Sequence, residues 1–250
     1  MSKLAPDQTA MADFLAKLRP GGPWMLCCFA KDRPPGPAQT FRDLNASTAW
    51  ADRQNRDSWN VYYALNPLRR DMQKKANKLD VYAVSHLHVD ADPRAGEDRE
   101  EERAAILAEF TDHLPDDVPP PTWIIDSGNG YQALWQLRDP ILLPGEDESE
   151  DERWAAIAEV ERYTRWLESR FTRADNTFNV DRILRLAGTI NRKKNRSASL
   201  ASVVTYHPEH VYTLDQFQQA EPDKSRAAGT AMQVQVDKVV RVDDPTNDPR

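Results

Sequence analysis

The chain has 250 residues, enough for one large hydrophobic core or two small ones. Apolar residues make up 40% and charged residues 29%, as in an ordinary globular protein, and no stretch approaches the roughly 20 apolar residues of a membrane-spanning helix. The formal net charge of -7 excludes a uniformly basic nucleic-acid-binding protein. We therefore expect one catalytic unit that stays in the cytosol and has no membrane partner.

Hydrophobic patterning predicts helices and strands that alternate irregularly along the chain. Helical spacing is found at residues 11–18, 99–113 and 152–171, and the aromatic stripe of the last helix is expected to face the core. Runs of β-branched and aromatic residues predict strands at residues 24–30, 59–65, 81–89, 122–126, 131–137 and 200–206. Cys27 and Cys28 are adjacent in the first strand, so we expect them to be buried rather than to bind zinc or form a disulfide.

This order of elements favours an α+β fold over a doubly wound parallel sheet. The sequence SGNG between two of the strands is typical of a hairpin turn. Acidic runs at residues 97–102 and 146–152 are expected to be solvated, whereas basic residues gather at 69–78 and 182–196. Residues 221–250 are rich in polar residues and are expected to be a linker or flexible tail.

The first candidate site is Asp90 and Asp92, which follow the apolar strand at 81–89. Strand side chains alternate, so the two carboxylates should face the same side. Carboxylates held so close repel each other unless a cation lies between them, and oxygen ligands favour Mg²⁺ or Mn²⁺. The same spacing also occurs in nucleotide-sugar transferases and in simple turns or helix caps.

The second candidate is the turn from Ser127 to Gln132, with Asn129 between two glycines. Such a turn allows positive φ angles and can leave backbone N–H groups open to a phosphate, although Asn-Gly is also a common hairpin turn. The third candidate is Asp181, which precedes the cations Arg185 and Lys193. A carboxylate could complete a metal site there and the cations could hold phosphates, or the run could be a solvated surface.

In this order, the three segments resemble the archaeo-eukaryotic primase superfamily, most closely the primase-polymerases of plasmids and phages, including RepB-type replication primases. The resemblance runs from about residue 60, in NVYYALNP, to residue 193. It implies a catalytic half similar to an RNA-recognition-motif sheet at 79–220, preceded by a smaller α/β module at 1–78. Together these would form one primase-polymerase domain at 1–220.

The resemblance also implies roles for individual residues. Asp90 and Asp92 match the metal-binding pair, and Asp181 matches the third acid better than Asp175 does. Ser127 matches the serine of the nucleotide motif, while Gln132 stands where the family has histidine. Glutamine can hydrogen-bond a phosphate but cannot add positive charge. Nucleotide-binding residues would then be Ser127, Asn129, Gln132, Arg185 and Lys193.

These roles imply template-directed primase-polymerase activity, with two Mg²⁺ or Mn²⁺ ions supporting nucleotidyl transfer to a 3′-hydroxyl or an initiating nucleotide. Expected partners are a single-stranded DNA template, a primer strand, NTP or dNTP, and a replicative helicase in cis or in trans. The alternative is a non-catalytic replication initiator or single-stranded-DNA-binding module on the same fold. The preference for NTP or dNTP is open.

Overall fold

The computed structural model describes residues 4–30, 33–192 and 197–222. Their α-helices are α1 (Gln8–Leu18), α2 (Leu44–Arg56), α3 (Arg99–Phe110) and α4 (Glu150–Glu168). Their strands are β1 (Trp24–Phe29), β2 (Ala38–Phe41), β3 (Asn60–Ala64), β4 (Ala83–Ala91), β5 (Trp123–Asp126), β6 (Tyr131–Leu142), β7 (Ile183–Arg185), β8 (Ile190–Asn191), β9 (Ser199–Leu200), β10 (Ser202–Tyr206) and β11 (Val211–Tyr212). Short 3₁₀ turns lie at η1 (Lys78–Asp80) and η2 (Leu214–Gln216). The architecture is α+β, as the sequence predicts.

The smaller sheet has the strand order β2-β1-β3-β7, and all its pairings are antiparallel. Three of its strands come from the first 64 residues, but β7 comes from residues 183–185 and pairs with β3. From the sequence, residues 183–185 are expected in the other half of the protein, at 79–220. The late segment that carries the third candidate site therefore completes the early sheet.

The larger sheet is built around β6, the longest strand. The strand β4 lies along one edge of β6, while β5 and then β11 pair along the other edge, and β10 extends the sheet beyond β5. The strands β5 and β6 form the hairpin that the SGNG sequence predicts, closed by the pair Asp126 and Tyr131.

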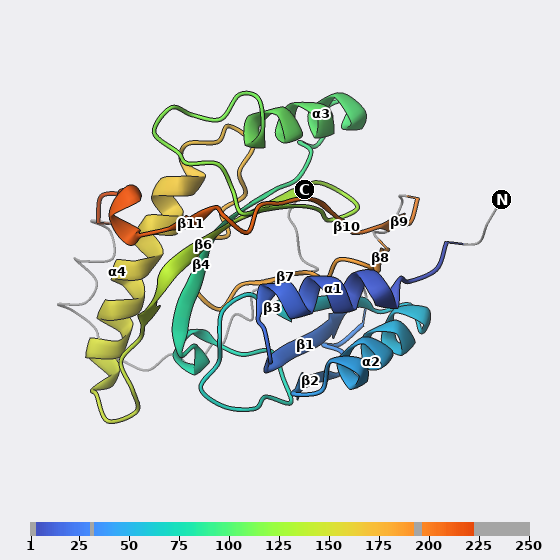
Figure 1. Cartoon of the computed structure of the whole chain (residues 1–250), viewed down its shortest axis with the longest axis horizontal. Helices are drawn as coiled ribbons and strands as arrows, with labels where there is room; N and C mark the ends of the chain where they lie inside the picture. Colours follow the sequence, from blue (N-terminus) through green and yellow to red (C-terminus); the bar gives the residue numbers. More distant parts are fainter. Residues whose placement is uncertain (1–3, 31–32, 193–196, 223–250) are drawn as a thin grey trace.

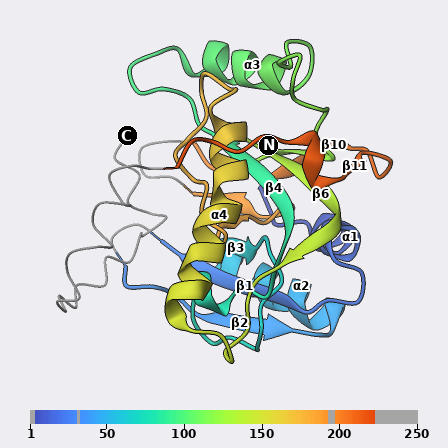
Figure 2. The same ribbon diagram turned by 90° about the vertical axis from the view of Figure 1, so that its left-hand side faces the viewer.

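The two faces of the larger sheet pack against different layers. Side chains such as Val89, Ala133 and Trp135 face a core with α3 and α4, as their alternation along the strands requires. The opposite face contributes Leu134 to a second core shared with α1, α2 and the smaller sheet. Figures 1 and 2 show α4 running alongside β4, whereas α1 and α2 lie beside the smaller sheet.

Helix α1 joins the two sheets through an aromatic contact. The ring of Phe14 meets Tyr63 of β3 at a centroid distance of 5.0 Å and Trp123 of β5 at 5.3 Å, both edge to face. Aromatic pairs in this geometry contribute about 0.5–1.5 kcal/mol each beyond the area they bury. The sheets therefore share one core, which fixes the space between them.

Most predicted strands and helices are confirmed, with differences at their ends. Cys27 and Cys28 are buried and free in β1, as expected. The expectation that every aromatic residue of α4 faces the core is wrong for Trp154, which is 42% exposed and donates a hydrogen bond to Glu150. The acidic runs lie mainly at the first turns of α3 and α4, where the helix dipole favours negative charge. Glu102 is an exception, because it is buried and paired with arginines.

Helix α2 is absent from the sequence-based expectation. Its buried face consists mainly of small and polar residues, so the sequence offers few large apolar side chains to indicate a helix. The buried side chain of Asn55 donates to the carbonyls of Trp59 and Ile190 at 2.8 and 2.9 Å and accepts from the Ile190 N–H at 2.7 Å. A single amide therefore connects the end of α2 to the start of β8.

We predict that Asn55→Ala lowers the free energy of unfolding by on the order of 2–3 kcal/mol, because it leaves buried backbone groups without partners. Denaturant unfolding measures this loss. The matched control is Asn45→Ala, an exposed position on the same helix, which should cost less than about 0.5 kcal/mol. Equal losses at the two positions would contradict the bridging role of Asn55.

No helix among the described residues is both long and apolar enough to cross a membrane.

Candidate functional site

The candidate site lies between the two sheets, where β4 ends. Asp90 lies opposite Gln132 of β6 in the strand register. On β4, Asp90 alternates with Val89 and Ala91, which pack against the α3 and α4 side, so its side chain faces the smaller sheet. Asp92 follows directly after the strand and is close enough for its charge to raise the pKa of Asp90.

Arg182 is the principal charge partner of Asp90. Its Nη2 atom donates to Asp90 Oδ2 at 3.1 Å, and only 16% of the Asp90 side chain is exposed. Burial raises the pKa of Asp90 above its ordinary value, Arg182 opposes that rise, and Asp92 adds to it. Gln132 also donates a hydrogen bond to this carboxylate. Asp90 is therefore a negative charge in a confined space that favours further positive charge.

Gly130 allows the hairpin to approach the two aspartates. A Cβ atom at this position would lie 1.9 Å from the carbonyl oxygen of Ala91 and 2.7 Å from Asp92 Oδ1. Any other residue would have to push the end of β4 away. Glycine is therefore required at position 130 because the hairpin backbone passes so close to the end of β4. Gly128 is needed for another reason, since its φ angle is positive, at 82°, as the sequence predicts for the turn.

The expectation that this turn leaves its backbone N–H groups open is wrong. The N–H of Gly128 donates to Asp126 Oδ1 at 2.7 Å. The N–H groups of Asn129 and Gly130 donate to the Ser127 hydroxyl oxygen at 3.3 and 3.1 Å. A serine side chain that accepts from nearby N–H groups stabilises a turn locally. In this structure Ser127 holds the hairpin together.

Arg185 lies on β7 in a largely buried position beside Tyr62. Its guanidinium stacks on the Tyr62 ring at 4.2 Å, and its Nη2 atom donates to Tyr62 Oη at 2.8 Å and to Asn191 Oδ1 at 3.1 Å. Its Nε and Nη1 atoms are buried without a hydrogen-bond partner. Buried donors without partners are rare in native proteins, and a bound anion would satisfy them.

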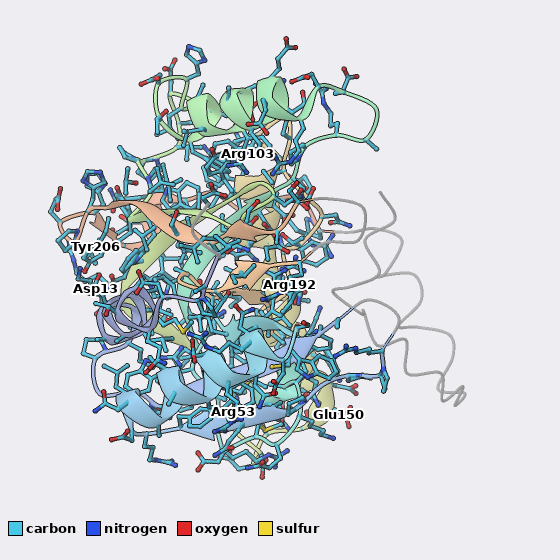
Figure 3. All side chains as sticks on the ribbon, turned by 90° about the vertical axis from the view of Figure 1, so that its right-hand side faces the viewer. Asp13, Arg53, Arg103, Glu150, Arg192 and Tyr206 are labelled. Atoms are coloured by element: carbon cyan, nitrogen blue, oxygen red, sulfur yellow. The ribbon has the colours of Figure 1, made fainter. Side chains whose placement is uncertain are left out.

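Arg185 lies near a second arginine, Arg192, and is connected to the β5–β6 hairpin through Asn191. The Nδ2 atom of Asn191 donates to the Ser127 carbonyl at 2.9 Å, so the polar chain runs from Arg185 through Asn191 to the turn. Burial and then the charge of Arg185 lower the pKa of Arg192, which shows that the two cations are near each other. Figure 3 shows Arg192 at the level between the two sheets. Lys193, the other cation singled out by the sequence, lies outside the described residues.

The third acid has different surroundings. Asp181 is 11% exposed, its Oδ2 atom lies 3.7 Å from Lys75 Nζ, and its Oδ1 atom accepts from Asn179 Nδ2 at 2.8 Å. Asp175, the competing residue, is tied to β4 through its backbone, because its N–H donates to the Asp90 carbonyl at 2.8 Å. Arg182, the residue after Asp181, also contacts β4 through its hydrogen bond to Asp90. Both segments therefore lie close to β4, and both acids stay candidates for the third ligand.

The carboxylates are not assembled as a compact ligand set. In the described part of the chain, Asp90, Asp92 and Asp181 do not present three ligand atoms within 4.8 Å of one another. The chemistry of Asp90 and Asp92 nevertheless fits a hard divalent cation, because two neighbouring carboxylates, one of them buried with a raised pKa, are stabilised by added positive charge. Lys75 and Arg182 supply part of that charge.

The histidines of β4, His86 and His88, are buried and neutral. Burial lowers the pKa of His86 to about 3 and that of His88 to about 4. The Nε2 atom of His88 donates to the Thr177 carbonyl at 2.8 Å, and Thr177 in turn donates from its N–H and hydroxyl to Glu168 of α4 at 2.7 and 3.0 Å. These contacts hold the segment before Asp181 against β4.

Sequence reasoning missed Tyr62, Lys75, Arg182 and Asn191. Arg182 directly follows the predicted acid and lies in the predicted basic run, so its position was visible but its pairing with Asp90 was not. Asn191 and Tyr62 lie in segments that carry the resemblance, but the sequence assigns neither of them a role. Contacts between residues so far apart in sequence depend on the way β7 joins β3.

No protein-family model and no curated protein matches the sequence. Among solved structures, the archaeo-eukaryotic primase domain of the cyanophage S-2L primase-polymerase is similar, with a TM-score of 0.57 at 16% identity over 85% of this chain and 97% of that one. The chain therefore has the archaeo-eukaryotic primase fold. At this identity the likeness concerns the fold and not the activity.

Two structures of primase RepB′ are less similar to this chain. One matches with a TM-score of 0.48 at 15% identity, over 80% of this chain and 56% of that one. The other is its catalytic domain in complex with initiator DNA, with a TM-score of 0.49 at 15% identity, over 80% of this chain and 86% of that one.

Glu168 gives the site region a measurable pH dependence. Burial raises the pKa of its carboxyl to about 7, against about 4.3 in an unfolded chain. Between these values the folded state binds the proton and the unfolded state does not. Stability is therefore greatest below the unfolded pKa and should fall by on the order of 3 kcal/mol as the pH rises through about 7.

We predict that Glu168→Gln removes this slope, because the amide oxygen can still accept from Thr177 but does not ionise. Denaturant unfolding of both proteins between pH 4.5 and 8 measures it. Glu148→Gln, at an exposed position, is the control and should keep the wild-type slope. Parallel curves for wild type and Glu168→Gln would contradict the raised pKa.

Proposed function

We propose that this protein is a template-directed primase-polymerase that transfers nucleotides to a 3′-hydroxyl or to an initiating nucleotide. The observation that carries the proposal is that a mostly buried acid and an arginine with unsatisfied donors both lie between the same two sheets. The acid is Asp90, whose pKa is raised by burial and by Asp92, and the arginine is Arg185, whose Nε and Nη1 atoms have no hydrogen-bond partner. Nucleotidyl transfer needs both features, because it brings a triphosphate and divalent cations together.

We assign the divalent cations, Mg²⁺ or Mn²⁺, to Asp90, Asp92 and Asp181. When bound, such ions lower the barrier by favouring the ionised 3′-hydroxyl and by stabilising negative charge on the transferring phosphate and on pyrophosphate. Asp90 and Asp92 would hold an ion at the end of β4, and Asp181 or Asp175 would have to approach them. The bound ions would then replace part of the positive charge that Arg182 now supplies to Asp90 and Lys75 to Asp181.

The triphosphate is assigned to the cations beside the hairpin. Arg185 offers two buried donor atoms and Arg192 lies near it, while Lys193 is assigned to the triphosphate from the sequence alone. Arginine suits phosphate because its planar group can donate two parallel hydrogen bonds. Ser127 and Asn129 would position the hairpin, and Gln132 would orient Asp90 through the hydrogen bond it makes there.

In the proposed reaction the primer oxygen attacks the α-phosphorus of the incoming nucleotide, and the bond to the β-phosphate breaks, which releases pyrophosphate. No side-chain nucleophile is needed. The remaining partners are a single-stranded DNA template and a primer strand, with a helicase in cis or in trans. The likeness to a phage primase-polymerase domain supports this choice of reaction over other metal-dependent phosphoryl chemistry.

One observation favours the competing reading, in which the chain is a replication initiator or single-stranded-DNA-binding module without catalysis. Arg182 already neutralises Asp90 at 3.1 Å, and Lys75 lies 3.7 Å from Asp181. A protein that does not bind divalent cations could keep its acids paired in this way. The two readings differ in whether the acids are needed for activity or only for folding.

We predict that Asp90→Asn abolishes primer extension with Mg²⁺ or Mn²⁺ while the protein stays folded. The amide has nearly the same shape and can still accept a hydrogen bond from Arg182, but it lacks the charge that a cation needs. Asp112→Asn, an exposed position, is the control and should extend primers at the wild-type rate. Extension by Asp90→Asn at that same rate would remove Asp90 from the metal site.

A second substitution tests the phosphate assignment. Arg185→Ala should raise the KM for nucleotide on the order of 10- to 100-fold, because a charge-assisted hydrogen bond is worth about 1.5–3 kcal/mol. Arg185→Lys should recover only part of this loss, since lysine lacks the planar pair of donors. Arg138→Ala, an exposed position on β6, is the control. An unchanged KM in a folded Arg185→Ala protein would give Arg185 a purely structural role.

A further inference from the structure

A second set of candidate ligands lies in the turn between β10 and β11. The residues His207, Pro208, Glu209 and His210 form a β-turn in which the N–H of His210 donates to the carbonyl of His207 at 3.0 Å. Proline is favoured at the second position of such a turn because its φ angle is fixed. The turn therefore brings two imidazoles and a carboxylate together within four residues.

The ligand atoms are closely spaced. The Nδ1 atom of His207 lies 3.3 Å from Glu209 Oε1, and the Nε2 atom of His210 lies 4.0 Å from the same oxygen. Among the described residues, His207, Glu209 and His210 form a group of three potential metal ligands whose ligand atoms all lie within 4.8 Å of one another. Tetrahedral zinc bonds of about 2.0–2.1 Å place neighbouring ligand atoms about 3.4 Å apart. Small side-chain rotations would complete that geometry.

The protein orients these ligands from outside the turn. The Nδ1 atom of His210 lies 3.1 Å from the Pro121 carbonyl, which can only accept, so Nδ1 carries the hydrogen and Nε2 keeps its lone pair for a metal. A hydrogen bond of this kind from the second ring nitrogen is found in most histidine metal ligands. Thr122 holds both ends of the turn, since its hydroxyl donates to the His210 carbonyl at 2.5 Å and its carbonyl accepts from the His207 N–H at 2.9 Å.

The arrangement of the two rings also fits a cation. One carboxylate oxygen, Glu209 Oε1, lies near a nitrogen of each ring. The two imidazole rings lie nearly parallel, with centroids 4.7 Å apart and an angle of 24° between their planes. A single ion could therefore contact both rings together with the Glu209 carboxylate.

We propose that His207, Glu209 and His210 form a binding site for a divalent transition-metal ion, zinc by preference. Two nitrogens and one carboxylate oxygen suit zinc and its first-row neighbours and do not suit Mg²⁺, which prefers oxygen ligands. Three protein ligands leave one position for water or for a group from a partner. The ion would hold the connection between β10 and β11 against the start of β5.

This site is separate from the acids at the end of β4. Tyr206, labelled in Figure 3, directly precedes the turn and pairs with Trp123 at the start of β5, whereas the Ser127 turn follows the other end of β5. The Tyr206 and Trp123 rings are stacked at a centroid distance of 3.8 Å. The proposal therefore does not rest on nucleotidyl transfer.

The test is equilibrium dialysis of the full chain, without a polyhistidine tag, against Zn²⁺ and separately Co²⁺ in a large excess of Mg²⁺. The excess Mg²⁺ occupies sites made of oxygen ligands, such as the acids at the end of β4, so that Zn²⁺ or Co²⁺ bound there does not contribute to the result. We expect one transition-metal ion for each chain, and for Co²⁺ the visible absorption of a site of low coordination number. The double substitution His207→Gln with His210→Gln should lower the affinity by more than the roughly 10- to 100-fold that loss of a merely orienting residue costs.

Three further proteins make the result decisive. His113→Gln alters an exposed histidine outside the turn and should bind as wild type does. Asp90→Asn should also keep the ion, even if it lacks polymerase activity. Glu209→Gln alters an exposed residue and gives a readout if the double variant does not fold. No ion retained by the wild type, or equal affinity in wild type, Glu209→Gln and the folded double variant, would overturn the proposal.

Discussion

The contact between Asp90 and Arg182, 3.1 Å long, is the interaction on which the candidate site depends. It joins the end of β4 in the larger sheet to the residue that leads into β7 in the smaller sheet. Neither charge would be stable alone in this mostly buried position, because desolvation disfavours the ionised form. The pair therefore links the two sheets directly at the candidate site.

Several parts of this arrangement could be predicted from the sequence. The strand that leads to Asp90 and the strand that begins at Tyr131 have apolar runs bounded by turn residues, and such runs indicate strands from the local sequence alone. The hairpin at Ser127 could be predicted because glycines at fixed positions have few other uses. The overall likeness to archaeo-eukaryotic primases was visible in three ordered segments, and the similarity of the fold confirms it.

Other parts depend on contacts that no local pattern encodes. Helix α2 was missed because Asn55 and other buried polar residues replace the usual apolar stripe. The open backbone groups expected in the hairpin are in fact satisfied by Asp126 and Ser127. The pairing of β7 with β3 joins segments about 120 residues apart, and it creates the stacking of Arg185 on Tyr62. Roles for single residues were therefore harder to predict than the elements that carry them.

The proposed activity makes one demand that a binding module does not, namely that the template decides which nucleotide is added. The most direct measurement uses two single-stranded templates that differ only in the base opposite the first position to be filled. With Mg²⁺ or Mn²⁺ and each nucleotide offered separately, the account predicts that the incorporated nucleotide changes with the template base. Binding to both templates without incorporation, or incorporation that ignores the template, would contradict it.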